Sequence, residues 1–176
     1  MKLFKFMYPS DYIRSIRDYD FDAAFASGKR LILFDIDNTM VPHGAPADAV
    51  CTELINKLKA KGFSLCAVSN NKEPRVKMFC DKVGVPYVFK ADKPKASGYL
   101  KAVAMCGSSV NETLFFGDQI FTDIIGANRA GIDSILVRPI DRSTDEIQIK
   151  IKRIIEKPVI KAFFAEKGIA ITDYFN

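Results

Sequence analysis

Short apolar runs, separated by longer stretches with apolar residues three or four apart, dominate the middle of the chain. The first run, residues 31–34, is continuous, which is typical of a strand buried on both faces of a parallel sheet. The same pattern predicts further strands over residues 63–68, 85–89, 113–116 and 134–137. Helical spacing predicts helices over residues 46–61, 74–83, 96–106 and 124–130. This alternation predicts an α/β fold with a doubly wound parallel five-stranded sheet.

The two ends of the chain depart from this alternation. Residues 1–30 carry aromatic and basic residues without a motif, which predicts a short helix and a loop packed on the sheet edge. An alternative is a weak contact with a membrane surface. That contact would use Lys2, Leu3, Phe4, Lys5, Phe6, Met7 and Tyr8. With no linker or repeat visible, we interpret residues 1–176 as one domain, with a core of about residues 31–140 and a helical tail over residues 144–176.

The tail has the pattern of a basic amphipathic helix, which Pro158 is expected to break or kink. Its apolar positions are Ile147, Ile151, Ile154, Ile155 and Val159. Its basic positions are Lys150, Lys152, Arg153, Lys157 and Lys161. Either the apolar stripe packs on the domain and the basic face is solvated, or the helix contacts an anionic membrane surface. The sequence leaves both interpretations open.

The composition indicates a globular protein but does not identify its partner. The 176 residues, 48% of them hydrophobic, suit one globular domain, and the net charge of +5 favours anionic partners without requiring nucleic acid. Four widely spaced cysteines are interpreted as thiols in a reducing compartment; they are Cys51, Cys66, Cys80 and Cys106. The start does not resemble a signal peptide, and no apolar run approaches about 18 residues. We therefore expect a cytoplasmic protein, with peripheral membrane contact through its basic ends as the open alternative.

Candidate chemistry follows four of the predicted strands. The residues are Asp35, Asp37 and Thr39, then Ser69 and Asn70, then Lys93, and finally Asp118 and Asp123. Parallel strands place the loops at their carboxyl ends on one edge of a sheet, so these side chains are expected to converge. Two carboxylates one residue apart at such an edge repel each other, and a hard cation compensates them. The sequence therefore predicts a magnesium site.

Each of these residues also has an ordinary structural explanation. Asp123 could cap the helix it opens, Ser69 and Asn70 could form a turn, and Lys93 could be solvated. Their joint occurrence at four strand ends makes coincidence the weaker explanation. His43 receives no role, because a lone histidine in a loop is usually solvated. Arg129 and Arg138 could contact an anionic substrate, although surface arginines usually do not.

In order, the motifs are D-x-D-x-T, S-N, K-P and G-D-x-x-x-T-D. Together they resemble the signatures of the haloacid-dehalogenase superfamily of phosphatases, and four motifs in the correct order are far more specific than one. The residues within these motifs are most similar to those of subclass IIIA, the YqeG-like branch, which is similar to phosphatidylglycerophosphate phosphatases. The resemblance covers about residues 31–140 and leaves both ends unexplained.

The resemblance implies a role for each motif residue. Asp35 would be the nucleophile, Asp37 the general acid and base, and Lys93 the cation that neutralises charge on Asp35 and on the transferring group. Thr39 would brace the loop through its hydroxyl, while Ser69 and the backbone around Asn70 would donate to phosphoryl oxygens. Mg²⁺ would be held by Asp35, by the backbone carbonyl of Asp37, by Asp118, and by Asp123 directly or through water.

The spacing of the motifs leaves no room for an inserted cap domain, so we expect an open site. An open site favours a large or membrane-presented phosphomonoester, because the substrate or a partner would have to exclude water. We therefore predict a Mg²⁺-dependent phosphomonoester hydrolase that uses an aspartyl-phosphate, with a phosphatidylglycerophosphate-like lipid as the favoured substrate. The alternatives are a phosphoprotein phosphatase and a non-catalytic module that binds phosphate or docks a partner. The oligomeric state is not predicted.

Overall fold

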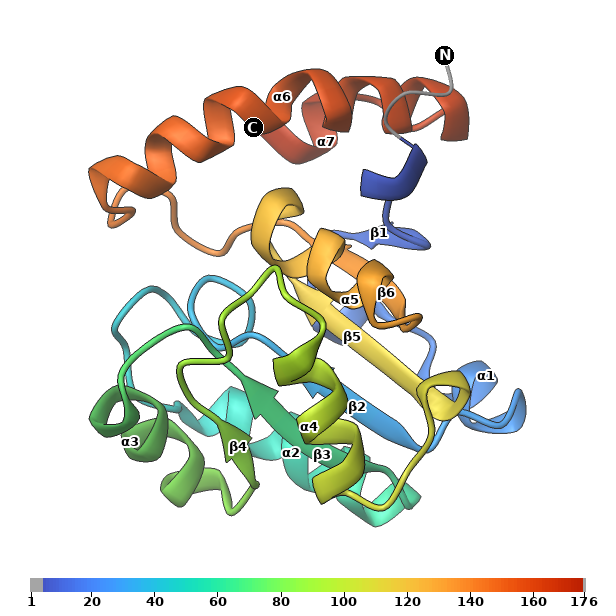
Figure 1. Ribbon diagram of the computed structural model, residues 1–176, viewed down its shortest axis with the longest axis vertical. Helices are drawn as coiled ribbons and strands as arrows, with labels where there is room; N and C mark the ends of the chain where they lie inside the picture. The colour runs from blue at the N-terminus through green and yellow to red at the C-terminus, as the bar shows by residue number, and fades with distance from the viewer. Residues whose placement is uncertain (1–4, 176) are drawn as a thin grey trace.

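A sheet of six parallel strands runs through the molecule (Figure 1). The structure is a computed structural model that describes residues 5–175. The strands lie in the order β1-β6-β5-β2-β3-β4. Their bounds are β1 Asp11–Ile13, β2 Leu31–Phe34, β3 Ser64–Val68, β4 Tyr87–Val88, β5 Thr113–Gly117 and β6 Asp133–Val137. The predicted fold class is confirmed, but the predicted number of five strands is wrong.

The additional strand lies in the N-terminal segment, where we expected only a helix and a loop. β1 pairs with β6 in parallel, with Asp11 opposite Ile135, and forms one edge of the sheet. The segment also contains the short helix α1, Phe21–Ala26. β1 has only three residues, none of them fully buried, so it lacks the apolar run that marked the central strands.

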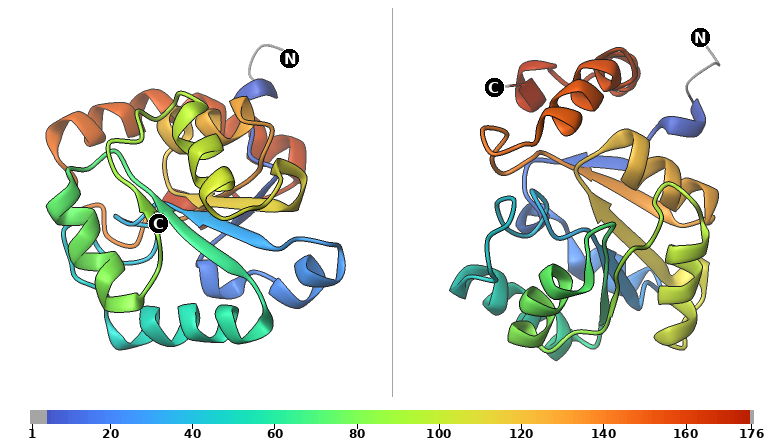
Figure 2. Two further views of the ribbon diagram at one scale, coloured as in Figure 1. Left: turned by 60° about the horizontal axis from the view of Figure 1, so that its bottom comes forward. Right: turned by 60° about the vertical axis from the view of Figure 1, so that its left-hand side comes forward.

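Helices cover both faces of the sheet, as the doubly wound fold requires (Figure 2). On one face, α2 (Ala49–Lys61) and α3 (Glu73–Val83) pack against apolar side chains of the central strands. On the other face lie α4 (Ser97–Met105) and α5 (Ile125–Arg129). The alternating side chains of β2 divide between these two cores, so both faces of the central strand are buried.

α2 begins later than predicted. We expected its first turn at Pro46, but the helix starts at Ala49 because Asp48 caps it. The Asp48 carboxylate accepts a hydrogen bond of 2.6 Å from the backbone N–H of Cys51. All four cysteines are free; Cys51, Cys66 and Cys80 are buried, and Cys106 is half-buried.

The tail forms one long helix, α6 (Ile147–Lys167), followed by the short helix α7 (Thr172–Phe175). The expected break at Pro158 is wrong, because α6 continues through that residue. Pro158 cannot donate a hydrogen bond to the carbonyl of Ile154, but Ile154 is 61% exposed, so water can reach this side of the helix. Figure 1 shows α6 crossing above the sheet with α7 beside it.

α6 buries a different face from the one we expected. Its packed residues form a cluster with Ile120, Leu136 and Tyr174. The packed residues are Val159, Ile160, Phe163 and Phe164, with Glu156. Of the five apolar positions in the sequence pattern, Val159 is buried, whereas Ile147, Ile151, Ile154 and Ile155 are 53–75% exposed. The interpretation that the whole stripe packs on the domain is therefore wrong. Within residues 5–175, none of the helices combines the length and the apolar character that crossing a membrane requires.

The N-terminal residues we considered for a membrane contact divide into two groups. Lys2, Leu3 and Phe4 lie outside the described residues. Of the others, Met7 and Tyr8 pack against the cluster under α6, and Lys5 pairs with Glu166 at 3.2 Å. Phe6 is exposed. Met7 and Tyr8 of this segment therefore have a structural role on the end of α6.

Candidate active site and metal centre

Three buried carboxylates meet at the carboxyl edge of the sheet. Asp35 follows β2, while Asp118 and Asp123 follow β5, the neighbouring strand. One carboxylate oxygen of each lies within 4.8 Å of the others. They are between 0% and 7% exposed. Sequence and sheet topology thus bring together three of the four predicted metal ligands.

Lys93, from the loop after β4, lies inside this cluster rather than in solvent. Its Nζ atom is 2.6 Å from Oδ1 of Asp35 and 2.7 Å from Oδ1 of Asp123. Asn70 holds the loop in place, because its Oδ1 accepts from the Lys93 backbone N–H (2.7 Å) and its Nδ2 donates to the Lys93 carbonyl (3.0 Å). Asn70 therefore orients Lys93 as well as lining the site.

Asp123 supports the loop that carries Asp118. Its Oδ2 accepts backbone hydrogen bonds from Asp118 (3.2 Å) and Gln119 (3.0 Å), so it does not act as a simple cap of the following helix. Gly117 permits this approach, because a Cβ atom there would lie 2.5 Å from the Cβ of Asp123. The Tyr99 hydroxyl donates to the Asp123 carbonyl at 3.0 Å. This close approach explains on steric grounds why the G-D motif has a glycine at position 117.

Asp118 is held by an arginine from the tail, which the sequence did not distinguish from its basic neighbours. Arg153 donates from Nη2 to Oδ2 of Asp118 and from Nε to Oδ2 of Asp145, both at 2.5 Å. The other oxygen, Oδ1 of Asp118, is buried without a hydrogen-bond partner among the described residues. A buried carboxylate oxygen without a donor is costly, and a cation can satisfy it.

The electrostatics of the cluster also call for a cation. Burial is the main cause that raises the pKa of Asp35 to about 8 and that of Asp118 to about 7. The Asp123 carboxylate acts in the same direction, and Lys93 and Arg153 oppose the rise. Burial disfavours the Lys93 ammonium, but Asp123 and Asp35 outweigh it and raise its pKa. Carboxylate oxygens are the ligands that Mg²⁺ prefers. The residues present therefore fit a divalent hard cation.

Asp37 lines the same cavity, but its carboxylate is outside the metal cluster. Its Oδ1 accepts from the Gly44 backbone N–H and from Nη2 of Arg75, each at 2.7 Å, and its Oδ2 accepts from Nδ2 of Asn71 at 2.6 Å. The surroundings of the Asp37 carboxylate are therefore polar. His43 Nδ1 lies 3.9 Å from the same Oδ1.

The loop after β2 is braced by Asn38 rather than by Thr39. Asn38 adopts a φ of +62°, its Nδ2 donates to Oδ1 of Asp145 (2.8 Å), and its Oδ1 accepts from the Asp141 backbone N–H (3.0 Å). The expected bracing by the Thr39 hydroxyl is not observed, because that buried oxygen has no hydrogen-bond partner among the described residues. Thr39 lines a separate cavity of about 230 Å³ together with Arg138.

The site cavity has a volume of about 240 Å³. It is lined by Asp35, Asp37, Asn38, His43, Ser69, Asn70, Asn71, Lys93, Gln119, Thr122, Asp123, Asp145, Glu146, Ile149 and Lys152. Ile149 and Lys152 come from α6, so the tail forms one wall of a site that has no inserted cap domain. Ser69 accepts from the Asn71 backbone N–H at 3.2 Å, which is a turn interaction. Arg129 contacts the carbonyl of Pro94 and does not line the cavity.

The fold and the site define a class, and comparisons with known proteins agree with it. The parallel doubly wound sheet carries Asp35, Lys93, Asp118 and Asp123 together at its carboxyl edge, where α/β proteins bind their ligands. The model of the haloacid dehalogenase-like hydrolases matches residues 43–131. The chain is 32% identical over 159 residues to "Probable phosphatase YqeG" of Bacillus subtilis, covering 90% of this chain and 92% of that protein. The chain therefore belongs to the haloacid dehalogenase-like hydrolase family, and it is a phosphatase.

More distant relatives extend the comparison. "Phosphatidylglycerophosphate phosphatase 1, chloroplastic" of Chlamydomonas reinhardtii is 29% identical, over 81% of this chain. The corresponding chloroplastic/mitochondrial protein of Arabidopsis thaliana is 23% identical over 97% of this chain. The matches span 56% and 51% of those longer proteins. The cobalt-bound deoxy-D-mannose-octulosonate 8-phosphate phosphatase of Haemophilus influenzae shares the fold, with a TM-score of 0.52 and 10% identity over 77% of this chain and 90% of that one.

Proposed function

We propose that this chain is a Mg²⁺-dependent phosphomonoester hydrolase that forms an aspartyl-phosphate on Asp35. The observation that carries the proposal is the buried cluster, in which Lys93 bridges Asp35 and Asp123 while Oδ1 of Asp118 has no donor among the described residues. Mg²⁺ would be held by Asp35, the Asp37 carbonyl and Asp118. It would neutralise charge that develops on the phosphoryl oxygens. Because both Asp123 oxygens already accept hydrogen bonds, we propose that Asp123 acts on the metal through water.

The proposed reaction has two balanced steps. A carboxylate oxygen of Asp35 attacks the phosphorus, the bond to the leaving oxygen breaks, and that oxygen takes a proton from Asp37. Water then attacks the phosphorus and gives a proton to Asp37, and the bond between phosphorus and Asp35 breaks to release phosphate. Asp37 now accepts three hydrogen bonds, so at least one of them must break before it can carry the proton. Ser69 and Asn70, which line the cavity, are proposed to contact the phosphoryl group.

A lipid phosphate of the phosphatidylglycerophosphate type is our proposed substrate. The names of the two longer relatives support it, as does the contribution of Ile149 and Lys152 to the cavity wall. The basic Lys152 suits the anionic head of such a lipid, and the apolar Ile149 suits its apolar body. Four free cysteines support a reducing compartment, and we propose that the protein works in the cytoplasm at the membrane surface.

Hydrolysis of p-nitrophenyl phosphate tests the chemistry. We expect activity to disappear after chelation and to return with Mg²⁺, and we expect Asp35→Asn to abolish turnover while circular dichroism stays unchanged. Asp81→Asn, on the exposed surface of α3, is the matched control and should retain full activity. Metal-independent hydrolysis, or an active Asp35→Asn variant, would overturn the mechanism. Comparing phosphatidylglycerophosphate in micelles with phosphopeptides, nucleotides and sugar phosphates then tests the substrate.

A further inference from the structure

The structure assigns a membrane-docking surface to the outer side of α6. We define the outer isoleucine face as Ile147, Ile151, Ile154 and Ile155, which recur at helical spacing and therefore share one side of the helix. The packed side of α6, around Ile160 and Phe163, points into the domain. α6 thus carries two apolar faces, of which the outer one is 53–75% exposed. An amphipathic helix needs only one apolar face to pack on its own domain, so the second face calls for another partner.

Charge on the same helix indicates an anionic lipid surface as that partner. Between Ile147 and Ala165 the only acidic residue is Glu156, and it is fully buried. Lys150 and Lys161 lie on the exposed surface beside the outer isoleucine face. Lysine stems can lie along apolar acyl chains while their ammonium groups reach lipid phosphates. Glu146, which precedes Ile147, is exposed and lines the site cavity. Beyond it, the outer isoleucines are flanked by lysines, which matches an interfacial helix.

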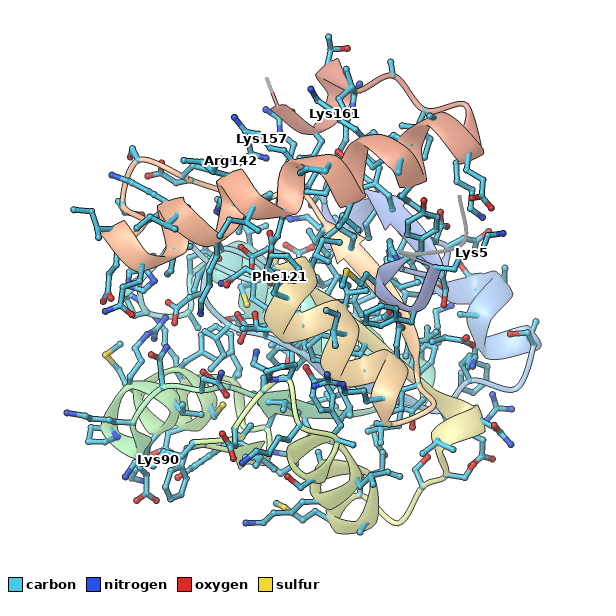
Figure 3. The ribbon with its side chains drawn as sticks, turned by 45° about the horizontal axis from the view of Figure 1, so that its top comes forward. Lys5, Lys90, Phe121, Arg142, Lys157 and Lys161 are labelled. Carbon is cyan, nitrogen blue, oxygen red and sulfur yellow. The ribbon has the colours of Figure 1, made fainter. Side chains whose placement is uncertain are left out.

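A groove beside this face extends the basic surface. It has a volume of about 520 Å³ and separates α6 from α7. Arg142, Lys150, Lys157 and Lys161 line it together with the apolar Ile154 and Ile171. Figure 3 shows Arg142, Lys157 and Lys161 near one another along α6, in agreement with their place in the lining of the groove. Ile154 belongs both to the groove and to the outer isoleucine face, so the two surfaces are continuous.

Docking through this face would place the site near the lipid. Ile149 and Lys152, between the outer isoleucines in sequence, line the site cavity on the opposite side of the same helical turns. One helix diameter, about 10–12 Å, then separates the lipid surface from the cavity. The inference rests on the proposed function in that it gives a lipid phosphate a route to Asp35. Membrane binding itself, however, requires no turnover.

Vesicle sedimentation tests the docking surface. The probes are vesicles of phosphatidylcholine alone and of phosphatidylcholine mixed with phosphatidylglycerol, at low and at high salt. We expect the protein to bind only the anionic vesicles and to release them as salt rises. The triple variant Ile147→Gln, Ile151→Gln, Ile155→Gln should lose on the order of tenfold in affinity. Glutamine keeps the helix propensity high, so the helix should persist.

Two control sets exploit other exposed residues. Met78, Leu100 and Met105, which are 44–50% exposed on α3 and α4, are changed to glutamine as the matched apolar control and should leave vesicle binding unchanged. Lys150→Gln with Lys161→Gln should weaken binding, whereas Lys57→Gln with Lys101→Gln, also exposed, should not.

The possible failures point to different causes. Equal binding of the triple isoleucine variant and the unchanged protein would overturn the docking surface. A dimer that dissociates in the triple variant, without any vesicle binding, would assign this face to a second copy of the chain instead. Hydrolysis of p-nitrophenyl phosphate by the triple variant should equal that of the unchanged protein, so a defect in the proposed chemistry is detected separately.

Discussion

Three buried carboxylates and one buried ammonium group lie together at the sheet edge. Lys93 compensates Asp35 and Asp123, whereas Arg153 compensates Asp118 from the opposite side. The two cations leave one oxygen of Asp118 without a donor among the described residues, and burial raises the pKa of that carboxyl to about 7. A divalent cation would complete this arrangement, which gives the individual aspartates different expected roles.

Asp118 and Asp123 should differ in their effect on metal binding. We expect Asp118→Asn to weaken Mg²⁺ binding by roughly a hundredfold or more, because Asp118 is the proposed direct ligand. Asp123→Asn should weaken it by about 10–100-fold, because Asp123 is proposed to act through water and the loop backbone. Isothermal titration calorimetry with Mg²⁺ measures both. Asp81→Asn, as above, is the control. The reverse ranking of the two variants would make Asp123 the direct ligand.

Glu156 should make the folded protein less stable as pH rises. Burial raises the pKa of Glu156 from 4.5 to about 7, so the folded state holds a proton that the unfolded state releases. The contribution of Glu156 to the free energy of unfolding is then fully present below about pH 4.5 and falls until about pH 7. The loss amounts to about 3 kcal/mol. Glu156→Gln keeps the acceptor for the Phe121 backbone N–H (2.8 Å) and should remove this loss.

Urea denaturation in the presence of a chelator measures this difference. The Gln variant should gain stability relative to the unchanged protein between pH 5 and pH 8, chosen to bracket the pKa of about 7. Glu166→Gln, at the exposed end of the same helix, should show no such trend. Parallel pH profiles for Glu156→Gln and the unchanged protein would show that the buried carboxyl does not titrate in this range.

At the scale of elements, the turn after β5 depends on a close approach. An alanine Cβ at position 117 would lie 2.5 Å from the Cβ and 2.7 Å from the Cγ of Asp123. The backbone holds residues 117 and 123 in place within the buried cluster. We expect Gly117→Ala to displace Asp123 and to reduce turnover of p-nitrophenyl phosphate by roughly a hundredfold, because a misplacement of about 1 Å costs that much. Steady-state kinetics checks the loss.

Gly107→Ala separates this steric effect from a general effect of losing glycine. Gly107 ends α4 with a φ of +62°, and a Cβ there would meet no atom within 4 Å. The substitution should cost about 1 kcal/mol of stability through its left-handed backbone and leave turnover unchanged. Comparable activity in the two alanine variants would mean that the turn accommodates the added methyl group.

The sequence predicted those elements whose burial is continuous and local. β2 and β5 are fully buried, so their apolar runs were visible, and the polar residues that follow them converge as the parallel topology requires. β1 was missed because an edge strand of three partly exposed residues has no such run. The course of α6 through Pro158 depends on which side of the helix faces water, and that is decided only by tertiary packing.

The candidate site was predictable in part for the same reason. The motif residues Asp35, Lys93, Asp118 and Asp123 meet as expected. Arg153 could not be singled out, since Lys150, Lys152 and Lys157 surround it in sequence and only the fold turns it inward. Likewise, Arg75 lies on α3, apart from every motif, yet its guanidinium binds Asp37. Contacts between residues distant in sequence cannot be read from local patterns.

For the molecule as a whole, Arg153 joins the tail to the core. Arg153, on α6, binds Asp118 at the end of β5 and also binds Asp145. Asp145 in turn accepts a hydrogen bond from Asn38 in the loop after β2. We expect Arg153→Gln to lower the free energy of unfolding of the metal-free protein by about 3–5 kcal/mol, because it leaves two buried carboxylates with less compensation. Urea denaturation with a chelator present measures this value.

Lys152→Gln is the matched control for this coupling, because the neighbouring lysine is exposed and forms no ion pair among those found in the described residues. Its change in stability should stay within about 0.5 kcal/mol. Hydrogen exchange adds a spatial readout: Arg153→Gln should accelerate exchange in residues 147–155 of α6 and in the loop after β2, whereas the inner strands should keep their protection. If the two variants are equally stable and exchange alike, α6 is held by its apolar packing around Phe163 alone, and the site does not depend on the tail.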